Sequence, residues 1–389
     1  MDVINNLFAD LHADLIQRRQ SGMYRTRRAI STAQGPAVRI AGRELLNFSS
    51  NDYLGLATHP DLLQTFKQAV TTYGLGSASS QLVCGHSVAH AELEEELARF
   101  TGRQRALVFS SGYLANLAVV SALVNRDALV IEDRLVHASM IDASRLSQAR
   151  IQRYPHADSN AVEYVLKNQQ AGRKLVLTDG VFSMDGDIAP LLPLAGVCQR
   201  QNAILIVDDA HGFGVLGPGG GGVVDLLGLG NDQVPVLIGT FGKALGAFGA
   251  FVSGDDVLIE LLIQKARSYI YTTALPPAIA VTVMRALSLV REEAWRRGHL
   301  FDLIRQFRDG CRQLGLRVSA SETAIQPLII GDATEAVRIS EELYRKGILI
   351  PAIRPPTVPA GTSRLRISLS AAHDESQVDY LLETLGEVL

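Results

Sequence analysis

Short apolar runs that alternate with helical segments between residues 105 and 252 constrain the fold more than any other feature of the sequence. Each run has the length and the β-branched or aliphatic composition that are typical of a buried strand. The runs are Leu107–Phe109, Leu129–Ile131, Leu175–Leu177, Ile204–Val207, Val236–Ile238 and Phe248–Val252. Strands that alternate with helices in this way predict an α/β fold built on a large, doubly wound, mostly parallel sheet.

Polar motifs follow most of these runs at or shortly after the point where the predicted strand ends. The motifs are Ser110–Tyr113, Val136–Ser139, Asp179–Ser183, Asp208–His211 and Thr240–Lys243. In an open α/β sheet the ligand site lies outside the carboxyl ends of the strands. We therefore expect these motifs to meet at one edge of the sheet.

The side chains in these motifs fit the chemistry of pyridoxal phosphate (PLP). Lys243 lies between glycines just after a buried strand, and a partly desolvated lysine can act as a nucleophile, although a surface turn is the commoner setting for such a residue. PLP also needs an acid for its ring nitrogen and donors for its phosphate. Asp208 would be the acid rather than Asp209, because neighbours on an extended segment point opposite ways. The turn Ser111–Tyr113 would bind the phosphate at a helix N-terminus.

The chain length of 389 residues is enough for two domains. We predict an N-terminal helical segment and arm over residues 1–45, a large PLP-binding domain over 46–283 and a small α+β C-terminal domain over 284–389. The break before the small domain is marked by Pro276-Pro277. The N-terminal helix should pack its apolar face against the body of the protein or a partner subunit, through Ile4, Leu7, Leu11, Leu15 and Ile16.

Charge and hydropathy exclude several classes of partner. The 37 Lys and Arg residues are balanced by 40 Asp and Glu residues, which argues against a nucleic-acid surface or a polybasic membrane patch. No apolar run approaches the ~18 residues needed to cross a bilayer. The N-terminus carries acids and lacks the pattern of a signal peptide. We expect a cytoplasmic protein without nucleic-acid or membrane partners.

His86, His90 and Glu94 recur every four residues, a spacing that would suit a metal site on a helix. Leu93 and Leu97 in the same segment favour a helix packed on the core, in which the histidines make local hydrogen bonds. We therefore predict no metal site here.

The chain resembles the α-oxoamine synthases, a family of PLP enzymes of fold type I, over nearly its whole length. The motifs that carry the resemblance are Asn47–Leu56, Asp179–Asp187, Val207–Gly212, Thr240–Lys243 and Ala352–Pro359. The first four are shared across the family. The Arg-Pro-Pro in the last motif resembles the same segment of the family members that act in biotin synthesis and of the serine palmitoyltransferase-like members. Glycine acetyltransferases usually lack it.

The resemblance implies a role for each matching residue. Lys243 would carry PLP as a Schiff base and later remove the α-proton, and Asp208 would pair with the pyridine nitrogen. His137 would stack on the ring and His211 would hydrogen-bond its O3′ atom. Other cofactor contacts would come from Gly112, Tyr113, Ser183 and Thr240, with Thr272 reaching the phosphate from the neighbouring subunit of a homodimer. Family members often have Phe in place of Tyr113. The candidates for binding substrate are Arg25, Asn51, Arg354 and Arg366, and either Arg354 or Arg366 would bind the amino-acid carboxylate.

The implied reaction is a decarboxylating condensation of L-alanine with a pimeloyl thioester of coenzyme A or acyl carrier protein. Glycine with acetyl-CoA and serine with a long-chain acyl-CoA would use the same residues, and an aminotransferase would share the fold. A non-catalytic PLP-binding regulator is disfavoured because no DNA-binding helix-turn-helix or basic extension flanks the PLP-like region.

Overall fold

The computed structural model of the protein describes residues 2–389, with side chains from residue 7 onward. The chain forms two compact units, one made of the chain up to Ser50 together with Asp302–Leu389 and the other of Asn51–Phe301. This division differs from the three parts expected from the sequence. Residue 283 lies inside α11 (Pro277–Glu292), and the N-terminal region joins the C-terminal one because β2 (Arg43–Asn47) pairs in parallel with β11 (Ile348–Leu349).

The larger unit is built on a seven-stranded sheet with the order β3-β9-β8-β7-β6-β4-β5. The strands are β3 (Arg105–Phe109), β4 (Leu129–Asp133), β5 (Arg150–Tyr154), β6 (Lys174–Asp179), β7 (Ile204–Asp208), β8 (Val236–Thr240) and β9 (Ala250–Gly254). Only β9 runs against the others, since it pairs antiparallel with both β3 and β8. The remaining strands are parallel, so their carboxyl ends lie at one edge, and the predicted α/β fold is confirmed.

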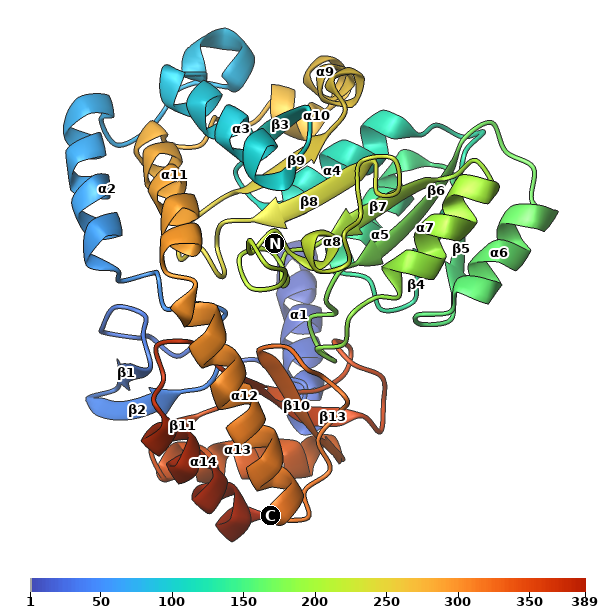
Figure 1. Cartoon of the computed structure of the whole chain (residues 1–389). Coiled ribbons are helices and arrows are strands. Elements are labelled where there is room, and N and C mark those ends of the chain that lie inside the picture. The colour runs from blue at the N-terminus through green and yellow to red at the C-terminus, as the bar shows by residue number, and fades with distance from the viewer. Residues whose placement is uncertain (1) are drawn as a thin grey trace. The chain divides into compact units, whose positions relative to one another are not determined.

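Helices cover both faces of this sheet, with α7 in front of it and α5 behind it in Figure 1. Along β6 the side chains of Leu175 and Leu177 belong to the same buried cluster as Met140 of α5, and the buried Val176 between them points to the opposite face. Both faces are buried, which explains the unbroken apolar runs. The helices of this unit are α2 (Pro60–Tyr73), α3 (Val88–Thr101), α4 (Gly112–Leu123), α5 (Ala138–Ser147), α6 (Ser159–Asn168), α7 (Leu191–Arg200), α8 (Val223–Leu226), α9 (Asp256–Lys265), α10 (Arg267–Ile270), α11 and a π-helical turn (Gln81–Gly85).

One strand, β5, was not predicted from the sequence. It lies at the edge of the sheet, where it pairs only with β4. An edge strand does not need a continuous apolar run, and charged residues there discourage pairing with other chains. The sequence of β5 is Arg-Ile-Gln-Arg-Tyr, which contains no apolar run that would predict a strand.

The smaller unit contains two three-stranded sheets, β1-β2-β11 and β10-β13-β12. Its further strands are β1 (Ala37–Ile40), β10 (Ile325–Gly331), β12 (Ala352–Ile353) and β13 (Ser363–Ser368), and its helices are α1 (Asp2–Gln20), α13 (Ala333–Arg345) and α14 (Glu375–Val388). The helix α12 (Trp295–Gln313) contains the boundary between the units. The predicted α+β character of this region is confirmed.

The described apolar side chains of α1, from Leu7 onward, are not covered by the rest of the single chain. Leu7, Leu11 and Leu15 are 54%, 50% and 45% exposed, while the side chain of Ile4 lies outside the described residues. The expected contact with a partner subunit therefore stays a prediction. None of the described helices combines the length and the apolar character that a membrane crossing requires.

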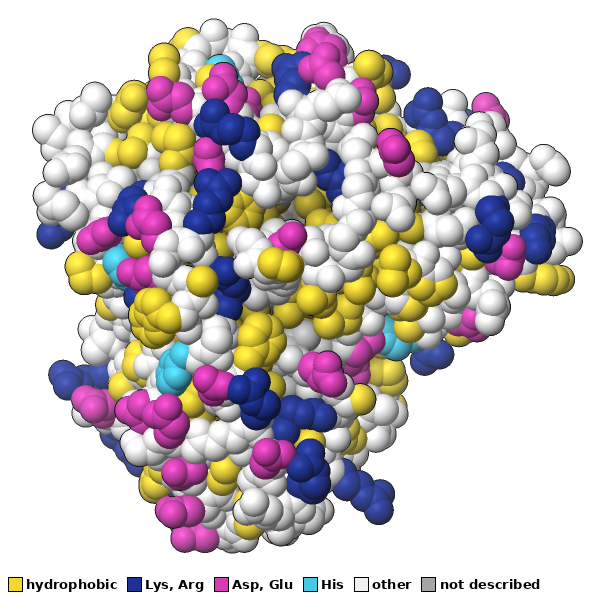
Figure 2. Space-filling view, in the orientation of Figure 1, with side chains coloured by type: hydrophobic (Ala, Val, Ile, Leu, Met, Phe, Trp, Pro, Cys, Tyr) yellow, Lys and Arg dark blue, Asp and Glu magenta, His cyan; other side chains and the backbone are white. Residues whose placement is uncertain are grey.

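Acidic and basic side chains are interspersed over the face of the molecule seen in Figure 2. Many of them form ion pairs within one unit. Arg105 contacts Asp256 and Glu260, for example, at 3.0 and 3.3 Å. Charges of one sign are thus offset by near neighbours.

Candidate active site

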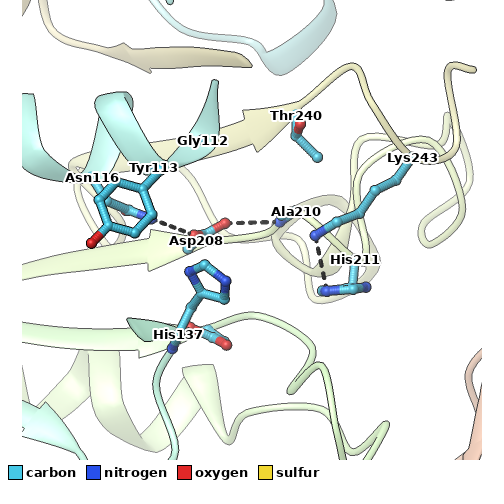
Figure 3. Close-up of a pocket in the computed structure, with 10 residues that line it drawn as sticks. Gly112, Tyr113, Asn116, His137, Asp208, Ala210, His211, Thr240 and Lys243 are labelled. Carbon is cyan, nitrogen blue, oxygen red and sulfur yellow. Dashed lines mark hydrogen bonds between the residues drawn. The ribbon is translucent and has the colours of Figure 1, made fainter. Parts of the chain in front are cut away.

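A cavity of about 190 Å³ lies at the carboxyl edge of the large sheet (Figure 3). Its lining residues come from the ends of four parallel strands or the loops that follow them, and from the start of α4. They are Gly112, Tyr113, Asn116, His137, Asp179, Asp208, Ala210, His211, Thr240 and Lys243. The polar motifs that follow the predicted strands therefore meet at one site, as the parallel strand order requires.

Lys243 and His211 begin a chain of hydrogen bonds at one side of the cavity. The Nζ atom of Lys243 lies 2.9 Å from Nε2 of His211, and Nδ1 of His211 lies 2.7 Å from the hydroxyl of Tyr53. That hydroxyl in turn donates to Oδ1 of Asn51 at 3.1 Å. With Lys243 as an ammonium group, which can only donate, His211 accepts at Nε2 and donates from Nδ1. Asn51 is thereby connected to Lys243 through Tyr53 and His211. Tyr53 was not among the site residues predicted from the sequence.

Asp208 and Asp209 point in opposite directions from the end of β7. The two oxygens of Asp208 accept hydrogen bonds from the backbone N–H of Ala210 at 3.0 Å and from Nδ2 of Asn116 at 2.7 Å, and the residue lines the cavity. Asp209 is fully buried elsewhere, and its Oδ2 accepts the backbone N–H of Val223 at 2.6 Å. Burial raises the pKa of Asp209 well above its usual range. Of the two acids, Asp208 is therefore the one available to a ligand.

Glycines make room for the Asp209 carboxyl group. A Cβ atom on Gly222 would lie 1.9 Å from Oδ2 of Asp209. Cβ atoms on Gly180 and Gly212 would lie 2.5 and 2.2 Å from Oδ1 of the same residue. Gly222 also has a φ of 92°, which favours glycine. The carboxyl group thus ties the glycine-rich loop to the end of β7.

His137 follows β4 and caps the N-terminus of α5. Its backbone N–H donates to Oδ1 of Asp179 at 3.2 Å. Burial lowers the pKa of His137, the positive charge of Lys243 acts in the same direction, and Asp208 opposes both. Burial and the neighbouring Asp208 also raise the pKa of Asp179. The neutral forms of His137 and Asp179 are both favoured as a result.

The N-terminus of α4 faces the cavity and suits a phosphate. Ser111 caps the helix through a hydrogen bond from the backbone N–H of Leu114 to its Oγ. A Cβ atom on Gly112 would meet nothing within 4 Å, so the space beside this residue is open. Helix N-termini bind anions through their free N–H groups and the helix dipole. The hydroxyl of Tyr113 donates to Asp142, and that of Thr240 donates to the carbonyl of Gly249 at 2.9 Å.

An amine, an acid, an imidazole and a helix N-terminus around one cavity are the groups that PLP requires. The residues present therefore fit this cofactor by the chemistry of their donors and acceptors.

The remaining predicted site residues lie outside this cavity. Ser183 lies in the loop after β6, and Thr272 lines a separate small cavity with Ser110. Arg25 and Arg354 line a cavity of about 440 Å³ within the smaller unit. Arg366 is 4% exposed on β13, where its Nη1 donates to the hydroxyl of Ser368 at 2.8 Å. Asn116 and Asp179 were missed as site residues, although Asn116 lies one helical turn after Gly112 and Asp179 begins a motif.

The three residues at metal-like spacing bind different partners. His90 accepts the backbone N–H of Ser87 at Nδ1 and approaches the carbonyl of Leu275 at 2.6 Å through Nε2. Glu94 accepts the backbone N–H of Val108 at 3.0 Å, and His86 contacts Gln81. Among the side chains from residue 7 onward, no group of three or more His, Cys, Asp or Glu residues is arranged to hold a metal ion.

A charged cluster joins the end of β4 to the loop after β6. Nδ1 of His156 lies 3.1 Å from Oδ1 of Asp133, at the end of β4, and Nε2 lies 2.9 Å from Oδ2 of Asp187, in the loop after β6. The ring also packs edge-on against Phe182. Burial alone would lower the pKa of His156, but the two carboxylates outweigh burial and raise it to about 10. His156 is therefore an imidazolium that joins β4 to the loop carrying Ser183.

Replacement of His156 by glutamine is expected to lower the free energy of unfolding by about 3 kcal/mol near pH 6, because two carboxylates lose their cation. The pKa of His156 is higher in the folded protein than in the unfolded chain, so its contribution is complete below the unfolded value of about 6.5. The contribution is lost as the pH rises through about 10. Urea unfolding of wild type and His156→Gln across this range measures the difference. The control is His12→Gln, which changes an exposed histidine on α1. A loss of unfolding free energy in His156→Gln that is equal at the low and the high end of the pH range would contradict a charge effect.

A lysine-bearing cavity at the carboxyl edge of such a sheet places the protein among the PLP-dependent enzymes of fold type I. The chain belongs to the class I and II aminotransferase family, whose profile matches residues 43–385. It is 55% identical to the 8-amino-7-oxononanoate synthase of Cellvibrio japonicus (strain Ueda107), over 99% of this chain and 97% of that protein. It is 56% identical to the 8-amino-7-oxononanoate synthase of Nitrosococcus oceani, over 97% of this chain and 100% of that one.

Solved structures agree with this assignment. The serine palmitoyltransferase of S. paucimobilis with bound PLP–myriocin aldimine matches with a TM-score of 0.93 and 30% identity, over 98% of this chain and 97% of that one. The 8-amino-7-oxononanoate synthase of Francisella tularensis matches with a TM-score of 0.77 and 32% identity, over 88% of this chain and 97% of that one. The resemblance to the α-oxoamine synthases is confirmed.

Proposed function

We propose that the protein condenses L-alanine with a pimeloyl thioester to form 8-amino-7-oxononanoate, with release of CO2 and of coenzyme A or the acyl carrier, in biotin biosynthesis. The observation that carries the proposal is the meeting of Lys243, Asp208 and His137 in one cavity, in a chain more than half identical to 8-amino-7-oxononanoate synthases over nearly their full length. The enzyme is a PLP-dependent acyltransferase. The serine palmitoyltransferases are more distant, at about 30% identity.

When bound, PLP supplies an electron sink for the negative charge that develops at the amino-acid α-carbon. Lys243 holds the cofactor through its Nζ atom and takes the α-proton. Asp208 offers a carboxylate oxygen to the ring nitrogen, with Asn116 and Ala210 fixing its orientation. His211 holds Nζ of Lys243 in place, and the N-terminus of α4 binds the phosphate. These roles are supported by the hydrogen bonds around the cavity.

The substrate carboxylates are assigned to arginines of the smaller unit. Arg354 lines its cavity together with Arg25, and its Nη2 donates to the carbonyl of Tyr24 at 2.7 Å. Arg366 stays a second candidate for the amino-acid carboxylate. Arginine suits this task because its planar group can bind both carboxylate oxygens.

The proposal includes a cytoplasmic homodimer with shared active sites. Two observations support the dimer: Thr272 lies outside the Lys243 cavity of its own chain, and the apolar face of α1 is exposed. Sedimentation of the active enzyme should give a mass of about two chains, and a fully active monomer would overturn this part of the proposal.

A substrate panel tests the proposed reaction. Alanine, glycine and serine are each combined with pimeloyl-, acetyl- and palmitoyl-CoA, and released thiol and CO2 are followed. We expect the pair of alanine and pimeloyl-CoA to have the highest kcat/KM, by at least about tenfold, because a mismatched chain loses one to a few kcal/mol of binding. A highest rate with serine and palmitoyl-CoA would instead indicate a serine palmitoyltransferase. Conversion of the cofactor to its amine form by alanine alone would indicate an aminotransferase.

A further inference from the structure

A buried chain of hydrogen bonds connects Asp208 to His137. Nδ2 of Asn116 lies 2.7 Å from Oδ2 of Asp208 and 2.8 Å from Oγ of Ser139. The same Oγ lies 2.7 Å from Nδ1 of His137. Asn116 is 1% exposed and Ser139 is fully buried, so bulk water does not compete for these contacts. Figure 3 shows Asn116 beside Asp208, with the His137 ring drawn just below the acid.

The direction of each hydrogen bond follows from the hydrogens that each group has. The amide nitrogen of Asn116 donates one hydrogen to the Asp208 carboxylate and the other to Oγ of Ser139. If the side-chain amide of Asn116 were rotated by 180°, its oxygen would face the Asp208 carboxylate, and two acceptors would lie together without a hydrogen between them. Because Ser139 accepts from Asn116, its single hydroxyl hydrogen is left for Nδ1 of His137. The backbone N–H of Ser139 also points to Nδ1, at 3.3 Å.

We propose that Asn116 and Ser139 are positioning residues that hold His137 as the neutral tautomer with its hydrogen on Nε2. Two donors aimed at Nδ1 leave no place for a hydrogen on that atom. Within the part of the chain that the structure describes, Nε2 of His137 has no hydrogen-bond partner, and the residue lines the cavity. The ring thus offers an N–H donor to an oxygen of the substrate. The catalytic value of this donor rests on the proposed function, whereas the tautomer follows from the hydrogen bonds alone.

The charges around His137 agree with a neutral ring. Burial disfavours an imidazolium most and so lowers the pKa of His137; Asp208, on β7, opposes this effect, and Lys243, on the loop after β8, adds to it. Asp179, on β6, accepts the backbone N–H of His137 and its neutral form is favoured. A hydrogen bond donated to the unprotonated Nδ1 disfavours protonation further.

A neutral imidazole with a fixed N–H group can stabilise negative charge on a substrate oxygen without first losing a proton. An imidazolium would be a stronger donor, but it would also transfer its proton more readily and would add charge beside Lys243. The network therefore assigns His137 the task of a hydrogen-bond donor rather than that of a general acid.

The tautomer is measured by nitrogen–proton correlation spectra of the full-length protein labelled with ¹⁵N-histidine, with and without PLP. The chain has nine histidines, so a spectrum of His137→Gln identifies the signals of His137. Near neutral pH we expect a protonated Nε2 and an unprotonated Nδ1 in both forms. An imidazolium, or a hydrogen on Nδ1, in the wild-type protein would overturn the proposal whether or not any variant folds.

Ser139→Ala tests the role of the hydroxyl group. The neutral ring then loses one hydrogen bond, so the pKa of His137 should rise by about one unit. Ser139→Thr keeps the hydroxyl and should restore the wild-type titration. The control is Ser144→Ala, which removes a buried hydroxyl from the same helix, α5, and one without a hydrogen-bond partner among the described residues. An unchanged His137 titration in Ser139→Ala would contradict the proposed role.

These measurements need no substrate. An enzyme that fails to condense alanine with pimeloyl-CoA but shows the expected tautomer would disprove the proposed function alone. The reverse result would disprove the role of Asn116 and Ser139 alone. In the active enzyme, the acidic limb of the pH profile of kcat/KM should move with the pKa of His137 in Ser139→Ala and stay in place in Ser144→Ala.

Discussion

Lys243→Ala is expected to lower kcat by at least about 10⁴-fold, because the variant loses both the nitrogen that holds the cofactor and the base that takes the α-proton. Lys243 is the only lysine among the residues that line the described cavity. Its contact with Nε2 of His211 at 2.9 Å shows that its amine reaches the imidazole across the cavity. Neither Tyr53 nor His211 can replace a primary amine in this task.

The fold should survive this substitution, since Lys243 is only partly buried and lies in a loop after β8. Thiol release measures the loss of activity, and absorbance near the visible edge measures the loss of the covalently held cofactor. The matched control is Lys265→Ala, at the exposed end of α9, which should leave both readouts unchanged. Normal turnover by Lys243→Ala would falsify the role assigned to this lysine.

The second large effect is expected from Asp208→Asn, which should lower kcat by about 10³-fold. The amide has the same shape, but it carries no negative charge for the ring nitrogen, and its single oxygen can accept only one of the two N–H groups that Ala210 and Asn116 donate to the carboxylate. The loss of one hydrogen bond should lower the free energy of unfolding by only about 1–3 kcal/mol, whereas the loss of activity is much larger. Urea unfolding and thiol release on the same sample separate these two quantities.

The neighbouring acid provides a matched control. Asp209→Asn removes a carboxyl group whose neutral form is already favoured by burial, and the amide oxygen can still accept the backbone N–H of Val223. We expect its kcat to stay within about tenfold of wild type, the effect of roughly one hydrogen bond. If the two variants ranked in the opposite order, Asp209 and not Asp208 would be the acid of the site.

Much of the site could be predicted because its residues follow buried parallel strands. Asp208, Thr240 and the residues near them are placed by local sequence, since a buried strand has an apolar run and its carboxyl end has a fixed direction. Helix periodicity could also have identified Asn116, which shares a face of α4 with Gly112. Tyr53 gave no such signal, because it lies in an irregular segment and reaches His211 only through the tertiary fold.

The parts of the fold that were missed have a physical reason in common. The edge strand β5 needs no apolar run, and β2 joins the C-terminal region through pairing with β11, about 300 residues away in the sequence. Neither feature changes the local hydrophobic pattern. The sequence alone therefore did not indicate that the chain up to Ser50 shares a unit with Asp302–Leu389.

The sequence by itself determined which residues form the buried strands and which polar groups follow them, because burial and chain direction act on neighbouring residues. Only the tertiary structure decided which atoms meet. Asn116 and Asp208 are separated by 92 residues, and their hydrogen bond depends on α4 packing on the sheet beside β7. The same packing brings Ser139 within reach of Asn116, and so fixes the hydrogens on His137. The tautomer of that ring depends on distances of a few tenths of an ångström, which no local pattern of residues specifies.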